Sequence, residues 1–217
     1  MIMAEHSGTH IDALCHQAEN MRLYGGQEAV APVQGPRGFS VLAAEHIPLL
    51  FSRGVLLDVA AARGVELIPP GELIDRQELA ETADRHGVDL MPGDVVLVRT
   101  GTGALWDNPD EYLEGAGMGV DASRWLARQS PVAVGSDNVA WDSPKVSDPE
   151  LGSLPGHVLL IVRGGIYIIE NLFLEELARE EIREFMLLCV PLKMRGVTAS
   201  PVRPLAIAPQ GDDERSG

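Results

Sequence analysis

Short, continuous runs of apolar residues recur along the chain and are bounded by glycine, proline or charged residues. Runs of this kind are typical of strands that are buried on both faces of a sheet. We therefore predict buried strands at Gly54–Val59, Val95–Arg99, Val132–Gly135, Ile166–Ile169, Phe185–Leu192 and Pro204–Ala208.

Helices are predicted between these strands from capping patterns and helical spacing. Asp75 and Glu78 match a capping box, and the helix that they open is expected to end at His86, before Gly87. In the last turn His86 suits the helix dipole, so we interpret it as a capping residue rather than a catalytic one. Further helices are predicted at Ala43–Phe51, Ser123–Arg128, Val158–Val162 and Leu174–Arg179.

Strands that alternate with short helices predict an α/β fold with a mixed sheet and short flanking helices. A chain of 217 residues is of ordinary size for a single domain. We place that domain at residues 1–209, with a long glycine- and proline-containing loop at residues 17–40. The polar residues 210–217 are expected to form a frayed tail.

Composition narrows the class of protein. The formal net charge of −15 argues against nucleic acid and anionic membrane as partners, so a small-molecule substrate is expected. The sequence holds no apolar run of membrane-spanning length and no signal-peptide pattern. Its two cysteines, Cys15 and Cys189, do not make a disulfide framework, which favours a reduced, cytoplasmic protein.

Candidate chemistry is concentrated near the N-terminus, in the stretch His6-Ser-Gly-Thr-His10-Ile-Asp12-Ala-Leu-Cys-His16. His6, His10 and Asp12 share one parity, so on an extended strand their side chains point to one face. Two imidazoles and a carboxylate suit a divalent transition metal with positions left open for water or substrate. Gly8 lets another group approach the backbone between these ligands. The alternative is a strand with one polar face and no metal.

The neighbouring residues of this stretch are assigned lesser roles. His16 follows Asp12 by one helical turn and could stand beside the metal as a proton-transfer group. Thr9 lies off the ligand face and is a weak candidate for orienting a ligand or the substrate. Cys15 also differs in parity from the ligands, so we interpret it as a packing residue.

A second His/Glu pair occurs downstream. Glu170 follows four buried apolar residues and must be paired, protonated or metal-bound, unless it only precedes a helix capped by Asn171. His157 is either a second ligand or simply the start of a helix. Asp137 and Asn138 follow a buried strand and are weak candidates for lining a substrate pocket.

With these motifs the chain resembles the metal-dependent cyclase family, which includes bacterial kynurenine formamidase and isatin hydrolase. The family signature H-x-G-T-H-x-D-x-x-x-H matches completely at His6–His16. Family-like stretches follow in order at Arg53–Asp58, Pro92–Gly101, Gly135–Asn138, His157–Leu172 and Ser200–Pro204.

The resemblance implies a swivelling β/β/α domain and a metal held by His6, His10 and Asp12. It also implies that Asp12 can bridge to a second ion held by His157 and Glu170, and that His16 is the acid/base. The metal would be Mn²⁺ or Zn²⁺, as one ion or two, and the protein a homodimer or homotetramer. Relatives carry several dozen residues before the signature, so we expect a pocket-walling family segment to be missing here.

Three functions follow as hypotheses. The first is a metal-dependent hydrolase that cleaves a C–N amide bond, either an isatin-like cyclic amide or an N-formyl amide. The second is a cyclase or dehydratase that uses the same metal on a carbonyl compound. The third is a metal-binding protein without catalytic activity.

Overall fold

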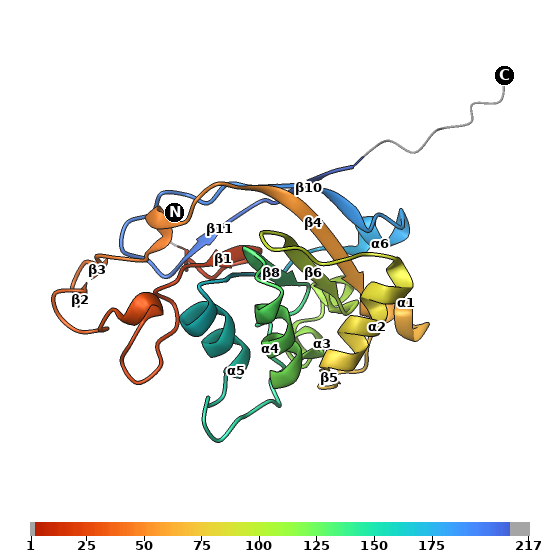
Figure 1. Cartoon of the computed structure of the whole chain (residues 1–217), viewed down its shortest axis with the longest axis horizontal. Helices are drawn as coiled ribbons and strands as arrows, with labels where there is room; N and C mark the ends of the chain where they lie inside the picture. The colour runs from red at the N-terminus through yellow and green to blue at the C-terminus, as the bar shows by residue number, and fades with distance from the viewer. Residues whose placement is uncertain (1–2, 209–217) are drawn as a thin grey trace.

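A curled mixed sheet of eight strands forms the centre of the computed structural model, which describes residues 3–208 (Figure 1). The order is β11-β1-β9-β8-β6-β4-β10-β12, and the four central strands are parallel. Antiparallel strands flank them at both sides. The strands are β1 His10–Asp12, β4 Leu50–Asp58, β6 Val95–Arg99, β8 Ala133–Ser136, β9 Tyr167–Glu170, β10 Glu184–Cys189, β11 Ala199–Pro201 and β12 Leu205–Ile207.

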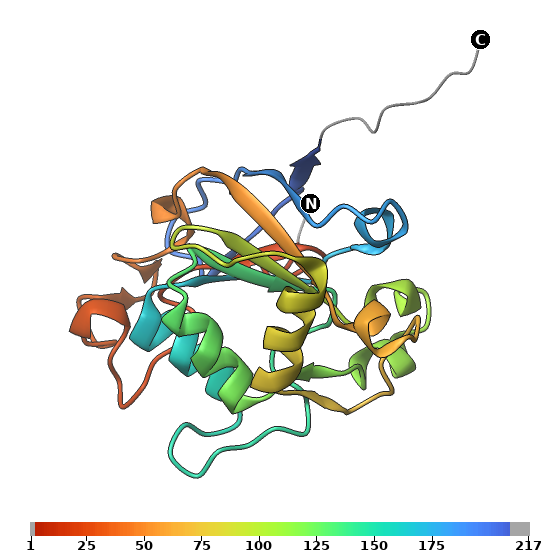
Figure 2. The ribbon, with the colours of Figure 1, turned by 45° about the vertical axis from the view of Figure 1, so that its right-hand side comes forward.

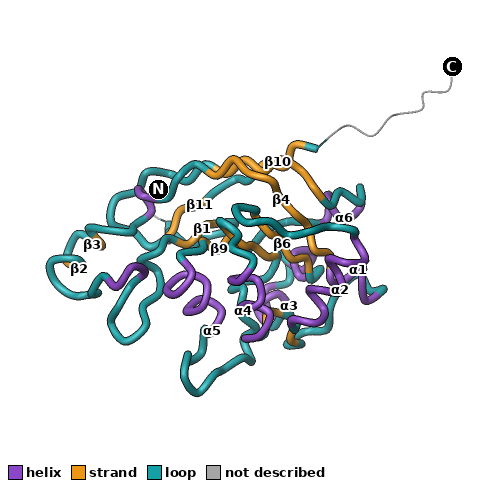
Figure 3. Tube along the Cα trace, viewed as in Figure 1, coloured by secondary structure: helices purple, strands orange, loops and turns teal. Residues whose placement is uncertain are grey.

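Short helices join the strands (Figure 3). They are α1 Val59–Arg63, α2 Arg76–His86, α3 Pro109–Leu113, α4 Val120–Arg128, α5 Pro155–His157 and α6 Glu175–Arg179. A π-helix, Val158–Gly164, continues directly from α5, and 3-10 turns occur at Tyr24–Gly26, Ala44–His46 and Thr102–Leu105. Two small ladders pair β2 Gln34–Gly35 with β3 Gly38–Phe39 and β5 Leu73–Ile74 with β7 Gly117–Met118.

One face of the central sheet packs on helices. Figures 1 and 2 both place α2 and α4 against the same side of the strands. Alternate side chains decide which core each strand residue enters, because successive residues point to opposite faces. Val96 and Val98 of β6 join the helix-covered core, whereas Val95 and Leu97 join the core on the other face.

The second core is enclosed by the curl of the sheet and by the N-terminal loops. Phe185 and Leu187 of β10 meet Leu97 of β6 and Ile11 of β1 there. Leu23 and Ile47 enter the same core from the loops that precede β4. The curl therefore gives β1 a buried partner on each side, which fixes the N-terminal motif against the end of β9.

The predicted fold class is confirmed: the chain forms one α/β domain with a mixed sheet and short flanking helices. The predicted central strands are confirmed, and so is α2. Asp75 and Glu78 form both bonds of the capping box, and Gly87 ends the helix in the left-handed region with φ 65°. The predicted tail, residues 210–217, lies outside the described residues.

The predicted helix at Ala43–Phe51 is wrong. Only Ala44–His46 coils, and Leu50 already pairs with Cys189 as the first residue of β4. The antiparallel ladder with β10 satisfies the backbone groups that a longer helix would have paired internally. The sequence also gave no signal for β11, the short α1 and α3, or the two small ladders.

None of the helices within residues 3–208 combines the length and the apolar character needed to cross a bilayer.

Candidate metal centre

The register between β1 and β9 places two predicted ligands side by side. His10, the first residue of β1, lies opposite Glu170, the last residue of β9. Their side chains meet, with His10 Nε2 3.2 Å from Glu170 Oε2. Asp12 follows on the same face of β1, and its Oδ1 lies 3.6 Å from His10 Nε2. Ile11 points to the opposite face and packs in the second core, so the alternation predicted for this stretch holds from His10 to Asp12.

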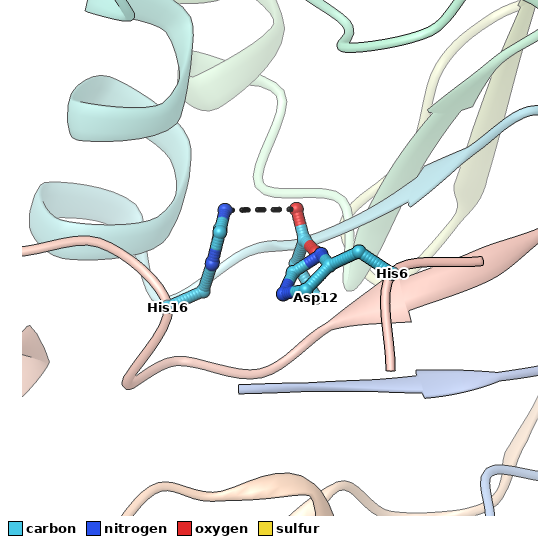
Figure 4. A group of neighbouring side chains, drawn as sticks. All are labelled: His6, Asp12 and His16. Atoms are coloured by element: carbon cyan, nitrogen blue, oxygen red, sulfur yellow. Dashed lines mark ion pairs between the residues drawn. The ribbon is translucent and has the colours of Figure 1, made fainter. Parts of the chain in front are cut away.

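His6 reaches the same point by a different route. The predicted strand does not extend to His6, because β1 begins at His10 and the preceding residues turn, with Gly8 at φ +60°. His6 Nδ1 nevertheless lies 3.1 Å from Asp12 Oδ1, and its Nε2 contacts Thr198 Oγ1 at 2.9 Å. Figure 4 shows the His6 and Asp12 side chains close together. His6 therefore approaches Asp12 through a turn of the backbone, and the extended strand predicted between them is wrong.

His157 enters the cluster from the helical side. Its Nε2 lies 3.3 Å from Glu170 Oε1 and 3.6 Å from Asp12 Oδ2. Its Nδ1 is 2.7 Å from Asp142 Oδ2, and the other oxygen of Asp142 accepts the Gly156 N–H at 2.7 Å. The Asp142 carboxylate therefore accepts hydrogen bonds from the N-terminus of α5 and also orients the His157 imidazole. Sequence reasoning missed Asp142, because an aspartate in a loop gives no signal of its partner.

The histidine rings are anchored in a way that suits metal ligands. His10 Nδ1 donates to the Gly8 carbonyl at 2.8 Å, as His157 Nδ1 does to Asp142. In each ring the outer nitrogen is held, and the other nitrogen faces the cluster. This pattern fixes the tautomer of metal-bound histidines and directs a lone pair at the ion.

Unpaired buried atoms mark the same point. Within residues 3–208, five buried side-chain atoms lack a hydrogen-bond partner, and four of them lie here: His10 Nε2, both oxygens of Asp12 and Glu170 Oε1. The fifth is Nδ1 of His86, the last residue of α2. Polar atoms of this kind carry a desolvation penalty unless something binds them. Two groups of ligand atoms are close enough to hold an ion: His6, Asp12 and His16, and His10, Asp12 and Glu170. The residues therefore fit one divalent ion, or two ions that share Asp12.

Protons link the cluster when no ion is bound. Burial lowers the pKa of His157, but its bonds to Asp142 and Glu170 outweigh burial and raise the pKa to about 10. Burial would raise the pKa of Glu170, but the nearby imidazoles of His10 and His157 outweigh burial and lower it to about 2. The imidazoles thus offset the charge of the buried carboxylates, and a divalent cation can take over this role.

His16 lies beside this centre. Its backbone N–H closes a turn with the Ala13 carbonyl, and its Nε2 lies 3.9 Å from Asp12 Oδ2 (Figure 4). The side chain is 26% exposed, so it remains accessible from solvent. Burial is the main reason why the pKa of His16 is lowered. A neutral imidazole at this position can accept a proton at neutral pH.

Cys15 points away from the cluster. It is buried in the second core with Sγ 3.8 Å from the Val197 carbonyl, and burial raises the pKa of the thiol to about 12. A thiol in this state is a packing residue, as its parity predicted.

Two adjoining cavities open next to the cluster. The larger, of about 490 Å³, is lined by His6, His10 and Glu170 on one side and by Trp106 and Tyr112 on the other. The smaller, of about 360 Å³, is lined by Thr9 and Phe173 among others. Trp106 and Asn171 line both. Trp106, Tyr112 and Asn171 were not predicted as pocket residues, since only the fold brings α3 to the end of β9.

The three weak candidates for substrate contact are engaged with the protein. The Thr9 hydroxyl donates to the Asn171 carbonyl at 2.6 Å. Asp137 is buried and accepts from the Thr100 N–H and hydroxyl and from the Gly101 N–H. The Asn138 carboxamide donates to the carbonyls of Ala116 and Trp141. The geometry therefore gives Asp137 and Asn138 a role in holding loops, and it offers no support for substrate contact by them.

The Cyclase family profile matches residues 1–143. The match covers more than half of the chain, and the chain therefore belongs to this family. No curated protein matches the chain significantly.

Solved structures agree with this assignment. A crystal structure described as a novel cyclase is 29% identical, with a TM-score of 0.83 over 95% of this chain and 70% of that one. A potential metal-dependent hydrolase with cyclase activity is 26% identical, with a TM-score of 0.63 over 94% of this chain and 80% of that one. An isatin hydrolase bound to the product analogue thioisatinate is 22% identical and shares the fold, with a TM-score of 0.74 over 96% and 74%.

Proposed function

We propose that this protein is a metal-dependent hydrolase that cleaves a C–N amide bond. The observation that carries the proposal is the set of buried, unpartnered atoms of His10, Asp12 and Glu170, which face one another beside a cavity. Two similar structures are described as a metal-dependent hydrolase with cyclase activity and as an isatin hydrolase, which supports this class. An isatin-like cyclic amide or an N-formyl amide is the proposed substrate.

The ligands are His6, His10, Asp12, His157 and Glu170, and the proposed ion is Mn²⁺ or Zn²⁺. When bound, such an ion supplies Lewis acidity for a carbonyl group and makes water more acidic. Glu170 and Asp12 supply negative charge that holds the cation, while Asp142 fixes the orientation of His157. One ion or two sharing Asp12 are both compatible with this donor set.

His16 is proposed as the acid/base. It lies next to Asp12 and is exposed enough to exchange protons with solvent. It would take a proton from the attacking water and return one to the nitrogen that leaves. Groups in this role contribute about 10²–10⁴-fold to the rate.

The test compares two variants after loading with Mn²⁺ or with Zn²⁺, using isatin and N-formylkynurenine as substrates. We expect His16→Ala to retain metal and lose turnover by about 10²–10⁴-fold, and His10→Ala to lose the metal itself. Metal loss as large in His16→Ala as in His10→Ala would contradict the division of roles and make His16 a ligand.

Proton release separates the other candidate functions. Hydrolysis of an amide to a carboxylate releases a proton at neutral pH, which a pH-stat records. Turnover of a carbonyl compound without proton release would instead indicate a cyclase or dehydratase. This alternative is kept because two similar structures are described as a cyclase or as having cyclase activity. A fully loaded protein without turnover would indicate a binding protein. The homodimer or homotetramer remains a prediction, to be tested by sedimentation.

A further inference from the structure

Asn171 follows the ligand Glu170 and is clamped on both sides of its backbone. Its N–H donates to the Asn138 carbonyl at 3.0 Å, and its carbonyl accepts from the Thr9 hydroxyl at 2.6 Å. Its φ of 56° lies in the left-handed region, which asparagine tolerates better than most residues but which still costs free energy. The surrounding contacts therefore hold Asn171 in one conformation at the end of β9.

Tyr112 fixes the side chain of Asn171 as well. The Tyr112 hydroxyl donates to Asn171 Oδ1 at 2.6 Å. This distance is typical of O–H···O bonds and is short for a bond that an amide nitrogen donates, so the oxygen of the carboxamide is the atom facing Tyr112. Tyr112 is itself only 5% exposed and packs edge-on against Trp106. The Nδ2 group must then point the other way.

The Nδ2 group of Asn171 has no acceptor among the described residues. Among the described residues it contacts His10 Nδ1, at 3.4 Å. That nitrogen already donates to the Gly8 carbonyl at 2.8 Å, so two donors face each other and no hydrogen bond forms. Asn171 lines both cavities beside the cluster. A fixed and unused N–H donor is thus placed at the wall of the site, next to a metal ligand.

We propose that Asn171 is a catalytic residue whose Nδ2–H donates to the carbonyl oxygen of the substrate, with Tyr112 as its positioning residue. This inference rests on the proposed amide hydrolysis. The donor gains strength as negative charge develops on that oxygen, because it is already oriented and needs no reorganisation. Removing a comparable donor in other enzymes lowers turnover by about 10²–10³-fold.

The experiment uses Asn171→Gly, which keeps the left-handed backbone and removes the amide. With the Mn²⁺-loaded protein we expect unchanged metal content, a fall in kcat of about 10²-fold on isatin and little change in KM. The Kd for benzoate, a carboxylate that offers an oxygen to the same donor, should rise about 10-fold. Asn20→Gly is the matched control, since Asn20 is exposed and also has a positive φ of 49°.

Tyr112→Phe tests the positioning role. Alone it should lower kcat about 10-fold, and in combination with Asn171→Gly it should add nothing, because the residue that it orients is gone. Additive losses in the double variant would overturn the positioning role.

The two proposals fail in different ways. Turnover within twofold of wild type in Asn171→Gly, with unchanged benzoate affinity, overturns the inference and leaves amide hydrolysis standing. If the wild-type protein cleaves no amide, but its affinity for benzoate still falls in Asn171→Gly, the proposed function is overturned. The assignment of Asn171 as a hydrogen-bond donor to a bound oxygen then stands.

Discussion

Two clusters of buried charge in this protein differ in how completely the protein satisfies them. Around Arg99, the guanidinium makes a two-pronged bond to Glu175 at 3.0 and 2.6 Å and a further bond to Asp58 at 3.0 Å. Its Nη2 group also donates to the Glu66 carbonyl at 3.1 Å. Every charged group there has a protein partner, so the cluster is complete without a ligand.

The cluster at the ends of β1 and β9 is different. Its histidines are anchored from outside, but Asp12 has two buried oxygens without a hydrogen-bond partner. Buried charge that is fully paired stabilises a particular packing, whereas buried carboxylates without a hydrogen-bond partner can bind a cation. The comparison therefore separates a cluster that the protein satisfies by itself from the candidate metal centre. Three measurements test this difference between the two clusters.

The largest effect is expected at the complete cluster. Arg99→Met removes the two-pronged partner of Glu175 and leaves the buried carboxylate of Asp58 with Arg183, at 3.4 Å, as its remaining cation. We expect the free energy of unfolding to fall by about 3 kcal/mol. Urea unfolding measures this loss. Arg163→Met is the matched control, because Arg163 pairs with Glu19 at the surface, where such pairs contribute about 0–1 kcal/mol. If the free energy of unfolding fell equally in the two variants, the Arg99 cluster would contribute no more to stability than a surface ion pair.

The next effect concerns the open cluster. An ion at a concentration 100 times its Kd should raise the wild-type free energy of unfolding by about 2.7 kcal/mol. Asp12→Asn should lose this gain, because Asp12 takes part in both groups of ligand atoms. Urea unfolding with and without Mn²⁺ or Zn²⁺ measures it. The Arg99→Met protein should be less stable yet still gain from the ion; an Asp12→Asn protein that gains equally would place the metal elsewhere.

The third effect is the pH dependence of the metal-free protein, which is the smallest of the three when taken per pH unit. The pKa of His157 rises from 6.5 to about 10 on folding, through Asp142 and Glu170 acting against burial. Protonated His157 therefore stabilises the fold fully below pH 6.5, and this contribution is lost as pH rises towards 10, by at most about 1.4 kcal/mol per pH unit.

Chemical unfolding between pH 6.5 and 9.5 in the presence of a chelator checks this slope. His157→Gln should flatten it. The metal-loaded protein should show the opposite trend, because its ligands bind the ion only when deprotonated. A metal-free protein whose stability rises with pH over this range would contradict the protonated cluster.

The structure confirms the elements that have local signals in the sequence and contradicts one that depends on a distant partner. The continuous apolar run of Val95–Arg99 and the capping box of Asp75 and Glu78 are local signals, and both elements formed as predicted. The helix predicted at Ala43–Phe51 failed because β10 pairs with β4 from far along the chain. Local propensity carries no information about such a partner.

The amino-acid sequence was enough to name side chains that could form the candidate centre. Spacing put His10 and Asp12 on one face of a strand, and the buried run before Glu170 indicated a carboxylate in need of a partner. Tertiary structure alone decided which atoms of these residues meet. The pairing of β1 with β9, the bond from Asp142 to His157 and the approach of Tyr112 to Asn171 join segments far apart in the chain. Contacts of this kind depend on how the whole sheet curls and packs, which no short window of residues encodes.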